Sequence, residues 1–478
     1  MKILALILPA ALTAFAAFAQ TAPTAPQIAE RLTANDLKAD VSFLASDALQ
    51  GRATPSPGLD IAAEFLAAQF RRSGLEPAGD DGYLQTAAFA SVKPNREKLE
   101  LTIEIGEKQL KVDPGLMTVW RPAAADLRDA AVARASTPAE AAAWKPEDTR
   151  GKVLLMEVSR FSRNPAEWDP AMVIMVESAA PRGIAGPALQ DASVPAERFP
   201  LLMVWDPAVR AALAADKTAA IRVSAHVAAP MVEPVKLRNV VGVLRGSDPA
   251  LKDTCLVLSA HYDHLGVRAG GEGDRIFNGA NDDASGAAAV VEIARALASQ
   301  PVKPRRSIVF ALFFGEEGGG LGSRYYTQHP VFPLARTIAD VNLEQLGRID
   351  DTQGSRPGQF NLTGFDFTNL APAIREAAQQ AGVQVVKDEK NNERYFGASD
   401  NLMFSMAGVP STTASVTYQF PDYHGVGDEW PKLDYDNMAK VDCALALAVF
   451  RLADSADAPQ WNAENPRTAA YMKARQAK

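Results

Sequence analysis

The sequence predicts an α/β protein in which a mixed, largely parallel sheet is flanked by helices and a β-rich segment is inserted. Three observations support this fold class. From Arg238 onward, strand-like runs alternate with helix-like runs. These strand-like runs are almost continuously apolar, as expected for strands covered on both faces. Between Val92 and Val235 the sequence pattern changes to short strand-like runs separated by Ala/Pro-rich loops.

The amino-terminal segment 1–19 has one Lys, an apolar run and small residues at Ala17 and Ala19, which is the pattern of a secretory signal peptide. The alternative is a membrane anchor. No later window approaches the roughly 18 to 20 apolar residues that a membrane span needs. We therefore expect an exported mature protein, periplasmic or secreted, without a membrane span. The residue directly after the predicted cleavage site at Ala19 is not Cys, which argues against lipidation.

A well-delimited helix is expected next, in "LDIAAEFLAAQFRRSG". Ile61, Phe65, Leu66 and Phe70 lie near helical spacing, and Gly74 ends the pattern. The following segment, 92–235, contains the strand-like runs "KLELTIEI", "GKVLLMEV", "AMVIMV" and "FPLLMVW". We expect it to fold as a β-rich inserted domain with few candidate catalytic residues.

The rest of the chain alternates strand-like "RNVVGVL", "TCLVLSA", "RSIVFALFF" and "RTIADVNL" with helix-like "ASGAAAVVEIARALASQ" and "NLAPAIREAAQQAG". Residues 20–91 and 236–455 are therefore expected to form one domain, and the polar tail 456–478 is expected to be loosely held. At 478 residues and 47% hydrophobic content, the chain can bury a large core.

Composition excludes some classes of protein. The only two cysteines, Cys255 and Cys443, lie in apolar runs, so a disulfide scaffold is excluded although one bridge remains possible. The formal net charge is −8, and there is no basic cluster with interleaved aromatic residues. These features argue against nucleic acid as a partner.

Polar residues follow three of the expected strands. His261 follows "LVLSA", Glu316 and Glu317 follow "IVFALFFG", and Glu344 follows "ADVNL". Ligands of α/β sheets bind beyond the carboxyl ends of the strands. Taken alone, the two adjacent glutamates would be interpreted as a solvated loop, because Glu mostly remains in water.

Two further motifs add candidates. In "SAHYDHLG", Asp263 could hold His261 by its second ring nitrogen, although a simple turn histidine is the alternative. In "GANDDASG", three polar residues precede a helix, and one of them could be an N-cap. The loop "PDYHGVGDEW" adds Tyr423, His424 and Asp428. Two histidines and several carboxylates at one sheet edge are the ligands that hydrolytic zinc prefers.

Five segments, "HYDHLG", "GANDDASG", "GEEGGGLGS", "NLEQLG" and "DYHGVGDEW", resemble in order the motifs of the co-catalytic dizinc aminopeptidases. This family includes secreted bacterial leucine-type aminopeptidases and the catalytic domain of glutamate carboxypeptidase II. "GLEPAGDDGYLQ" resembles the amino-terminal segment of the family, and 92–235 is similar in position and texture to its protease-associated insertion. The resemblance implies a zinc exopeptidase fold for the domain that carries the motifs.

The resemblance also implies roles for individual residues. His261 matches a ligand of one zinc ion and Asp282 matches the bridging ligand, while Glu317, Glu344 and His424 match the remaining ligands. Two Zn²⁺ ions per chain are therefore expected, and two metals sharing one carboxylate would explain why so many acids gather.

The other roles concern proton transfer and positioning. Glu316 resembles the general base, and Asp263 would orient His261. Tyr423 could donate a hydrogen bond to a developing oxyanion, with a packed aromatic as the alternative. His264 is interpreted as a support for its loop, with a direct role as the alternative. His226 and His329 have no expected role.

The sequence departs from the family at "GASDN", where Ala398 replaces an Arg of some members and Asn401 replaces the common His. This weakens inference about how the end of a substrate is held. The resemblance implies an exported aminopeptidase acting on peptides. The alternatives are a carboxypeptidase or dipeptidase on the same scaffold, a single-zinc cyclase-like reaction, and a non-catalytic binding protein. The sequence determines neither the preferred side chain nor the oligomeric state.

Overall fold

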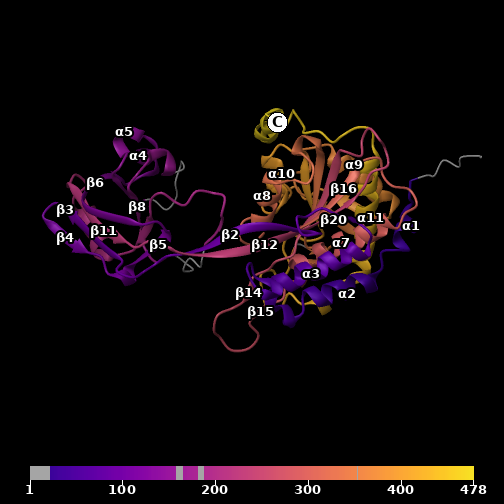
Figure 1. Ribbon diagram of the computed structural model, residues 1–478, viewed down its shortest axis with the longest axis horizontal. Coiled ribbons are helices and arrows are strands. Elements are labelled where there is room, and N and C mark those ends of the chain that lie inside the picture. The colour runs from indigo at the N-terminus through magenta and orange to yellow at the C-terminus, as the bar shows by residue number, and fades with distance from the viewer. Residues whose placement is uncertain (1–21, 158–164, 181–187, 353, 478) are drawn as a thin grey trace, which may run out of the picture. The chain divides into compact units, whose positions relative to one another are not determined.

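The structure is a computed structural model that describes residues 22–157, 165–180, 188–352 and 354–477. The chain forms two compact units (Figure 1): residues up to 86 together with 238–478 make the first, and residues 87–237 make the second. The expected insertion, 92–235, has ends within a few residues of the second unit. The expected signal segment 1–19 lies outside the described residues. No helix in the described part of the chain is long and apolar enough to cross a membrane.

The first unit is built on a mixed sheet with the strand order β21–β20–β22–β17–β13–β16–β12, and β1 pairs with β12. Strand β13 is parallel to both of its neighbours, β16 and β17, and β17 is parallel to β22. Strand β12 is antiparallel to β16, and β20 is antiparallel to β22. This arrangement confirms the predicted fold class. The strands are β1 (Glu76–Pro77), β12 (Met231–Leu244), β13 (Cys255–His261), β16 (Ser307–Phe313), β17 (Thr337–Leu343), β20 (Gln359–Leu362), β21 (Gln384–Val386) and β22 (Ser411–Ser415).

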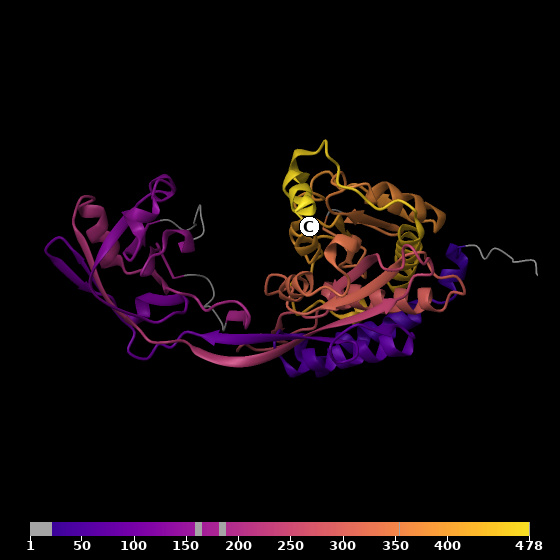
Figure 2. The same ribbon diagram turned by 45° about the horizontal axis from the view of Figure 1, so that its top comes forward.

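Helices cover both faces of this sheet, as Figure 2 shows. On one face, Phe313 packs with Tyr326 of α8 and Phe404 of α10. On the other face, the ring of Phe310 lies 6.4 Å from that of Phe70 on α3. Helices α7 and α11 also contact β13. The helices are α1 (Ala25–Ala29), α2 (Ala34–Leu44), α3 (Pro57–Arg72), α7 (Ser285–Ala298), α8 (Leu321–Gln328), α9 (Leu370–Gln380), α10 (Asn401–Met406), α11 (Tyr435–Asp454) and α12 (Ala469–Gln476).

Helix α3 confirms the expected helix but corrects its buried face. The Oγ of Ser56 accepts a hydrogen bond from the Leu59 amide at 3.1 Å and caps the first turn. Leu59, Leu66 and Phe70 are buried, whereas Ile61 is 50% exposed. At about 100° per residue, Ile61 is turned about 140° away from Leu66, which places it on the solvent side. The assignment of Ile61 to the apolar stripe is therefore wrong.

The carboxyl-terminal tail packs on the first unit, which contradicts the expectation that 456–478 is loosely held. Trp461 is buried, and its Nε1 donates to the Gly408 carbonyl at 3.0 Å. The Trp461 ring stacks on Tyr471, and Nη1 of Arg475 donates to the Leu334 carbonyl at 2.8 Å. The tail is polar on average, but two aromatic side chains are sufficient to anchor it to the domain.

Both cysteines of the chain are buried and free. Cys255 lies on β13 and is 3.6 Å from the Thr337 hydroxyl, whereas the Sγ of Cys443 on α11 donates to the Ala25 carbonyl at 3.3 Å. The disulfide bridge that composition allows is therefore not formed in this structure.

The second unit is a separate, curled β-sheet with the strand order β4–β3–β11–β6–β7–β8–β10–β5. Strands β6, β7, β8 and β10 run parallel, and the remaining pairs of this sheet are antiparallel. It has its own hydrophobic core, so the expected β-rich insertion is present; its kinship to protease-associated domains stays a prediction. The elements are β2 (Leu84–Lys93), β3 (Glu100–Ile105), β4 (Lys108–Lys111), β5 (Met117–Arg121), β6 (Ala125–Ala135), α4 (Pro138–Ala142), α5 (Pro146–Thr149), β7 (Val153–Met156), β8 (Met172–Val176), β9 (Ala188–Asp191), β10 (Leu201–Val204), α6 (Pro207–Ala215) and β11 (Ile221–Val227).

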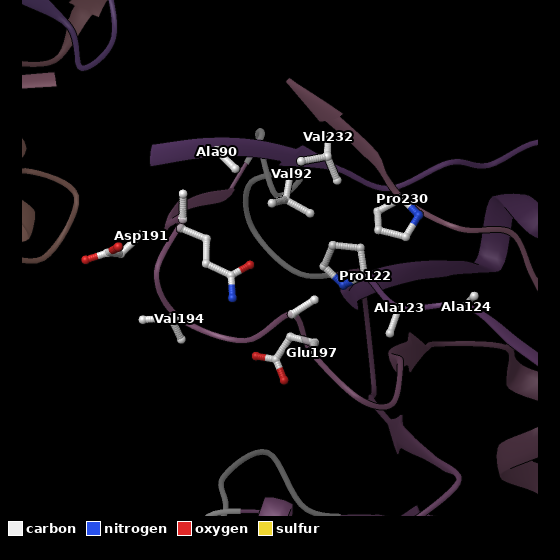
Figure 3. A pocket seen from close by; sticks show the side chains of 13 residues that line it. Ala90, Val92, Pro122, Ala123, Ala124, Asp191, Val194, Glu197, Pro230 and Val232 are labelled. Atoms are coloured by element: carbon white, nitrogen blue, oxygen red, sulfur yellow. The ribbon is translucent and has the colours of Figure 1, made fainter. Parts of the chain in front are cut away.

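An open cavity of about 460 Å³ lies within the second unit (Figure 3). Ala, Val and Pro side chains make most of its wall, with Gln190, Asp191 and Glu197 as the polar members. Oδ1 of Asp191 accepts a hydrogen bond from the Ser193 amide, and Glu197 pairs with Arg121 at 3.6 Å. None of the lining residues is His or Cys, so this cavity lacks the nitrogen and sulfur ligands that zinc sites use.

The separate core of the second unit leads to a stability prediction. Ile103→Ala removes a fully buried side chain and should lower the free energy of unfolding of this unit by about 2 to 5 kcal/mol. Ile61→Ala, at an exposed position, should change stability by about 0.5 kcal/mol or less. Thermal unfolding and zinc content should be measured together. Loss of zinc from a folded Ile103→Ala protein would contradict the independence of the two units.

Candidate metal centre

Three parallel strands bring the expected polar residues to one edge of the sheet. Strand β13 ends at His261, which is in register with Phe313 of β16. On the other side, Ser259 of β13 is in register with Asn342 of β17. Glu344 directly follows β17, and Glu316 and Glu317 follow β16 after two residues, so all three lie at the edge of the sheet where His261 ends β13, as predicted.

A first group of potential metal ligands comprises His261, Asp282 and Glu344. The Nε2 atom of His261 lies 3.3 Å from Oδ1 of Asp282 and 3.5 Å from Oε1 of Glu344. On the other side of the ring, Nδ1 of His261 lies 3.2 Å from the backbone oxygen of Asp263 and 3.5 Å from its Oδ1. The position of Asp263 fits the predicted role of orienting the imidazole.

A second group shares Asp282 and adds Glu317 and His264. The Nδ1 atom of His264 is 2.8 Å from Oε1 of Glu317 and 4.0 Å from Oδ2 of Asp282. The predicted ligand His424 reaches the same carboxylates, because its Nε2 lies 3.1 Å from Oδ2 of Asp282 and 3.4 Å from Oε2 of Glu317. All five predicted ligands thus meet at one place, and His264 lies closer to them than a support of its loop would require.

The unpaired atoms of these residues fit metal binding. The Nε2 of His261, the Oδ2 of Asp282, the Oε1 of Glu317 and both ring nitrogens of His264 are buried without a hydrogen-bond partner. Buried polar atoms are rarely left unpaired, because their desolvation is costly. Imidazole nitrogens and carboxylate oxygens are ligands of zinc. The donor set therefore fits two zinc ions that share Asp282, as the prediction of two Zn²⁺ requires.

The three consecutive polar residues before α7 have three separate tasks. Oδ1 of Asn281 accepts hydrogen bonds from the amides of Gly347 and Arg348 at 2.8 and 2.9 Å. Asp282 faces the imidazoles, and Oδ1 of Asp283 accepts from the Gly286 amide at 3.0 Å in the first turn of the helix. The N-cap interpretation therefore applies to Asp283, whereas the carboxylate of Asp282 remains available to bind metal.

Asp428, from the loop after β22, holds the backbone of Asp282. Its carboxylate accepts hydrogen bonds from the amides of Asn281 at 2.9 Å and Asp282 at 3.0 Å. Its backbone oxygen accepts from the Ala280 amide at 3.1 Å. The late "DYHGVGDEW" motif therefore contributes His424 to the metal ligands and Asp428 to their support.

In the metal-free protein, burial and neighbouring charges shift the pKa values of the clustered acids. Burial raises the pKa of Glu316 well above its usual range; His261 opposes this effect, and Glu344 adds to it. Burial also raises the pKa of Glu344. Burial acts against ionisation of Glu317 too, but the imidazoles of His264 and His424 close to its carboxylate lower its pKa overall. The two adjacent glutamates therefore have opposite pKa shifts, as two separate tasks would require.

The histidines take up protons when no metal is present. The nearby carboxylates of Asp282 and Glu317 raise the pKa of His424 to about 10. Burial acts to lower the pKa of His261, but the carboxylates of Asp263, Asp282 and Glu344 around its ring raise it well above the usual range. Because an imidazole must be neutral to ligate zinc, metal binding must displace these protons.

The remaining predicted residues fall in different places. Tyr423 is 37% exposed and its ring stacks on His424 at 4.1 Å, so it lies beside the ligands. His329 stacks on Tyr325 at the end of α8, and His226 lies on β11 of the second unit. The latter two are outside both ligand groups.

Sequence reasoning missed three residues near these groups. Arg52 and Thr54 contact the ligand-bearing segments from a site about 200 positions earlier in the chain, and no local pattern in "LQGRATP" signals this. Asp400 is buried with both carboxylate oxygens free of hydrogen bonds, and burial raises its pKa to about 7. Its motif, "GASDN", attracted attention only for its departures from the family.

Residues 239–449 match the model of Peptidase family M28. A protein named "Probable zinc metalloprotease" from Leptosphaeria maculans is 40% identical over 205 residues, which are 42% of this chain and 44% of that protein. Aminopeptidase YwaD of Bacillus subtilis is 24% identical over 233 residues, 47% and 46% of the two chains. The chain therefore spans less than half of the length of these relatives.

The solved aminopeptidase from Aneurinibacillus sp. strain AM-1 has a TM-score of 0.59 and 20% identity to this chain, and the match covers 91% of this chain and 97% of that one. At this identity the similarity shows the fold alone. Together with the family match, it confirms the resemblance inferred from the five motifs.

The raised pKa of His424 predicts the protons released on metal binding. Near neutral pH, zinc binding to the metal-free wild-type protein should release about one proton more than binding to His424→Asn, because His424 is protonated until the pH approaches about 10. Calorimetry in buffers of different ionisation enthalpy measures this number. His329→Asn is the control, and it should match the wild type. Equal release by wild type and His424→Asn would assign the second group to His264 instead.

Proposed function

We propose that this protein is an exported dizinc exopeptidase that removes amino-terminal residues from peptides. The observation that supports it best is the pair of ligand groups that share Asp282, with Glu316 at their side. Relatives named aminopeptidase and zinc metalloprotease support the reaction class. The signal-like pattern of residues 1–19 supports export.

His261, Asp282, Glu317, Glu344 and His424 would hold the metal ions. When bound, zinc lowers the pKa of a coordinated water towards neutrality and polarises a carbonyl oxygen. All five side chains are already gathered by the fold, so little rearrangement is needed for them to act as ligands. Asp282 belongs to both ligand groups and would be the ligand that the two ions share.

Proton transfer is assigned to Glu316 in this proposal. Its backbone amide donates to Oδ1 of Asp263 at 3.0 Å, which fixes the start of the Glu316–Glu317 turn. Glu317 is occupied by the imidazoles, so Glu316 remains to accept a proton from water and deliver it to the leaving amine. Tyr423, stacked on His424 at the exposed side, can hydrogen-bond a developing oxyanion.

The sequence leaves three alternative functions. A carboxypeptidase or dipeptidase would use the same ligands and differ in how the substrate terminus is held. A non-catalytic binding protein usually lacks metal ligands, whereas here every expected ligand position is filled. A cyclase-like reaction with one zinc would leave one of the two ligand groups without a purpose.

The two glutamates should respond differently to substitution. Glu316→Gln retains shape but cannot accept a proton, so it should keep two zinc ions and lose about 10²- to 10⁴-fold in kcat. Glu317→Ala removes a ligand and should lose or weaken one zinc ion. Glu147→Gln, at an exposed position of the second unit, is the control and should retain both activity and zinc. Equal zinc loss in both variants would refute the separate roles, and full activity of Glu316→Gln would refute catalysis by this residue.

The end of the peptide that is shortened tests the exopeptidase type. A labelled peptide should lose residues from its amino terminus, amino-terminal acetylation should block cleavage, and carboxyl-terminal amidation should not. Chelation should abolish cleavage, and zinc should restore it. Mass spectrometry of the products distinguishes the outcomes. Shortening from the carboxyl terminus would replace aminopeptidase by carboxypeptidase, and no cleavage by protein with two bound zinc ions would support the binding-protein alternative.

A further inference from the structure

Arg52 is a fully buried cation close to the metal ligands. Its Nε donates to the Tyr262 carbonyl at 2.8 Å, and its Nη1 donates to the Asn278 carbonyl at 2.7 Å and to the Leu44 carbonyl. Its Nη2 donates to the Gly279 carbonyl at 3.0 Å. The guanidinium of Arg52 thus donates hydrogen bonds to backbone oxygens of three separate segments.

Two of these segments carry the metal ligands. Tyr262 directly follows His261, and Gly279 opens the loop that contains Asp282. The carbonyl of Arg52 itself accepts a hydrogen bond from the His264 amide at 3.3 Å. One residue therefore ties together the backbone on which both ligand groups are built.

The backbone around Arg52 has little freedom to shift. Gly51 has φ 68°, and a Cβ at this position would lie 2.4 Å from the Phe277 carbonyl oxygen. Only glycine therefore allows this close approach. The close packing fixes the start of the Arg52 side chain against the segment 277–279.

Thr54 contacts the carboxylate that orients His261. Its Oγ1 donates to Oδ2 of Asp263 at 3.0 Å. The other oxygen, Oδ1 of Asp263, accepts from the Glu316 amide at 3.0 Å and faces Nδ1 of His261 at 3.5 Å. The Thr54 hydroxyl thus holds the carboxylate in the rotation that faces His261, which belongs only to the first ligand group.

Charge supports the same assignment for Arg52. Asp263, Asp282, Asp283 and Asp428 all attract its guanidinium. Because buried carboxylates are costly without positive charge, a fixed cation behind them reduces the mutual repulsion of the ligands before metal arrives.

We propose that Arg52 and Thr54 are positioning residues of the metal centre: Thr54 acts through Asp263 on the zinc site of His261, and Arg52 acts through the backbone on both zinc sites. This inference rests on the dizinc part of the proposed function. It does not depend on peptide cleavage, because its primary measurement is zinc affinity.

The Thr54 test is a zinc titration against a chromophoric chelator, with kcat and KM measured in parallel. Thr54→Val should weaken one of the two zinc ions about 10- to 100-fold and leave the other unchanged, and kcat should fall more than KM rises. Thr54→Ser should restore the affinity. The control is Thr468→Val, which removes a buried hydroxyl bonded to the Asn462 carbonyl far along the chain, and it should leave both affinities unchanged.

Arg52→Lys keeps the charge but loses the fork, and it should weaken both zinc ions. Arg306→Lys is its matched control, because Arg306 is also buried and donates to the Ala456 carbonyl. If Arg52→Lys does not fold, the Thr54 series decides the proposal.

Unchanged zinc affinity in Thr54→Val, or equal weakening of both ions, would overturn the role of Thr54. Zinc affinities of Arg52→Lys equal to those of Arg306→Lys would overturn the role of Arg52. A wild-type protein that binds two zinc ions but cleaves no peptide would refute the proposed function and leave this proposal testable. A wild-type protein that binds fewer than two would overturn the assignment to separate sites.

Discussion

The shared carboxylate of Asp282 is the constraint on which the rest of the first unit depends. Its two oxygens face imidazoles from different parts of the chain, with Oδ1 3.3 Å from His261 and Oδ2 3.1 Å from His424. A carboxylate can serve two partners only if its backbone is held firmly. The amides of Asn281 and Asp282 are accordingly bonded to Asp428, and the preceding Gly279 carbonyl is bonded to Arg52.

The α/β architecture supplies this rigidity. Parallel strands β13, β16 and β17 end at one edge, so side chains that follow them approach one another without long loops. Helix α7 begins directly after the Asp282 loop, and the positive end of its dipole favours the acids placed there. The same arrangement explains why the acids tolerate one another's proximity in the absence of metal, although burial still raises the pKa of Glu316 and Glu344.

The second unit differs from the first in its core and in its cavity. Its residues form a separate core on its own sheet, so its folding does not require the metal ligands. Its cavity is lined mainly by Ala, Val and Pro, in contrast to the histidines and acids of the metal centre. Both units thus have a hydrophobic core, whereas the ligand groups found in the described residues all belong to the first.

Much of this protein could be predicted from its sequence, because strong local patterns determine local structure. Continuous apolar runs identified β13, β16 and β17, and helical spacing identified α3 and α7. The motifs predicted the metal ligands and the class of chemistry. The tail is polar on average, which led to the wrong expectation that it is loosely held, although Trp461 and Tyr471 stack on each other. Spacing alone also placed Ile61 on the buried face of α3, where it does not lie.

Only the tertiary structure decided which residues support the ligands. Arg52 and Thr54 act from a segment far from His261 and Asp282 in the chain, and His264 and His424 approach the same carboxylates. Local sequence determines which side chains can ligate a metal, because that depends on their chemistry. The partners of each side chain depend on which distant segments the sheet brings together, and no pattern within one segment contains that information.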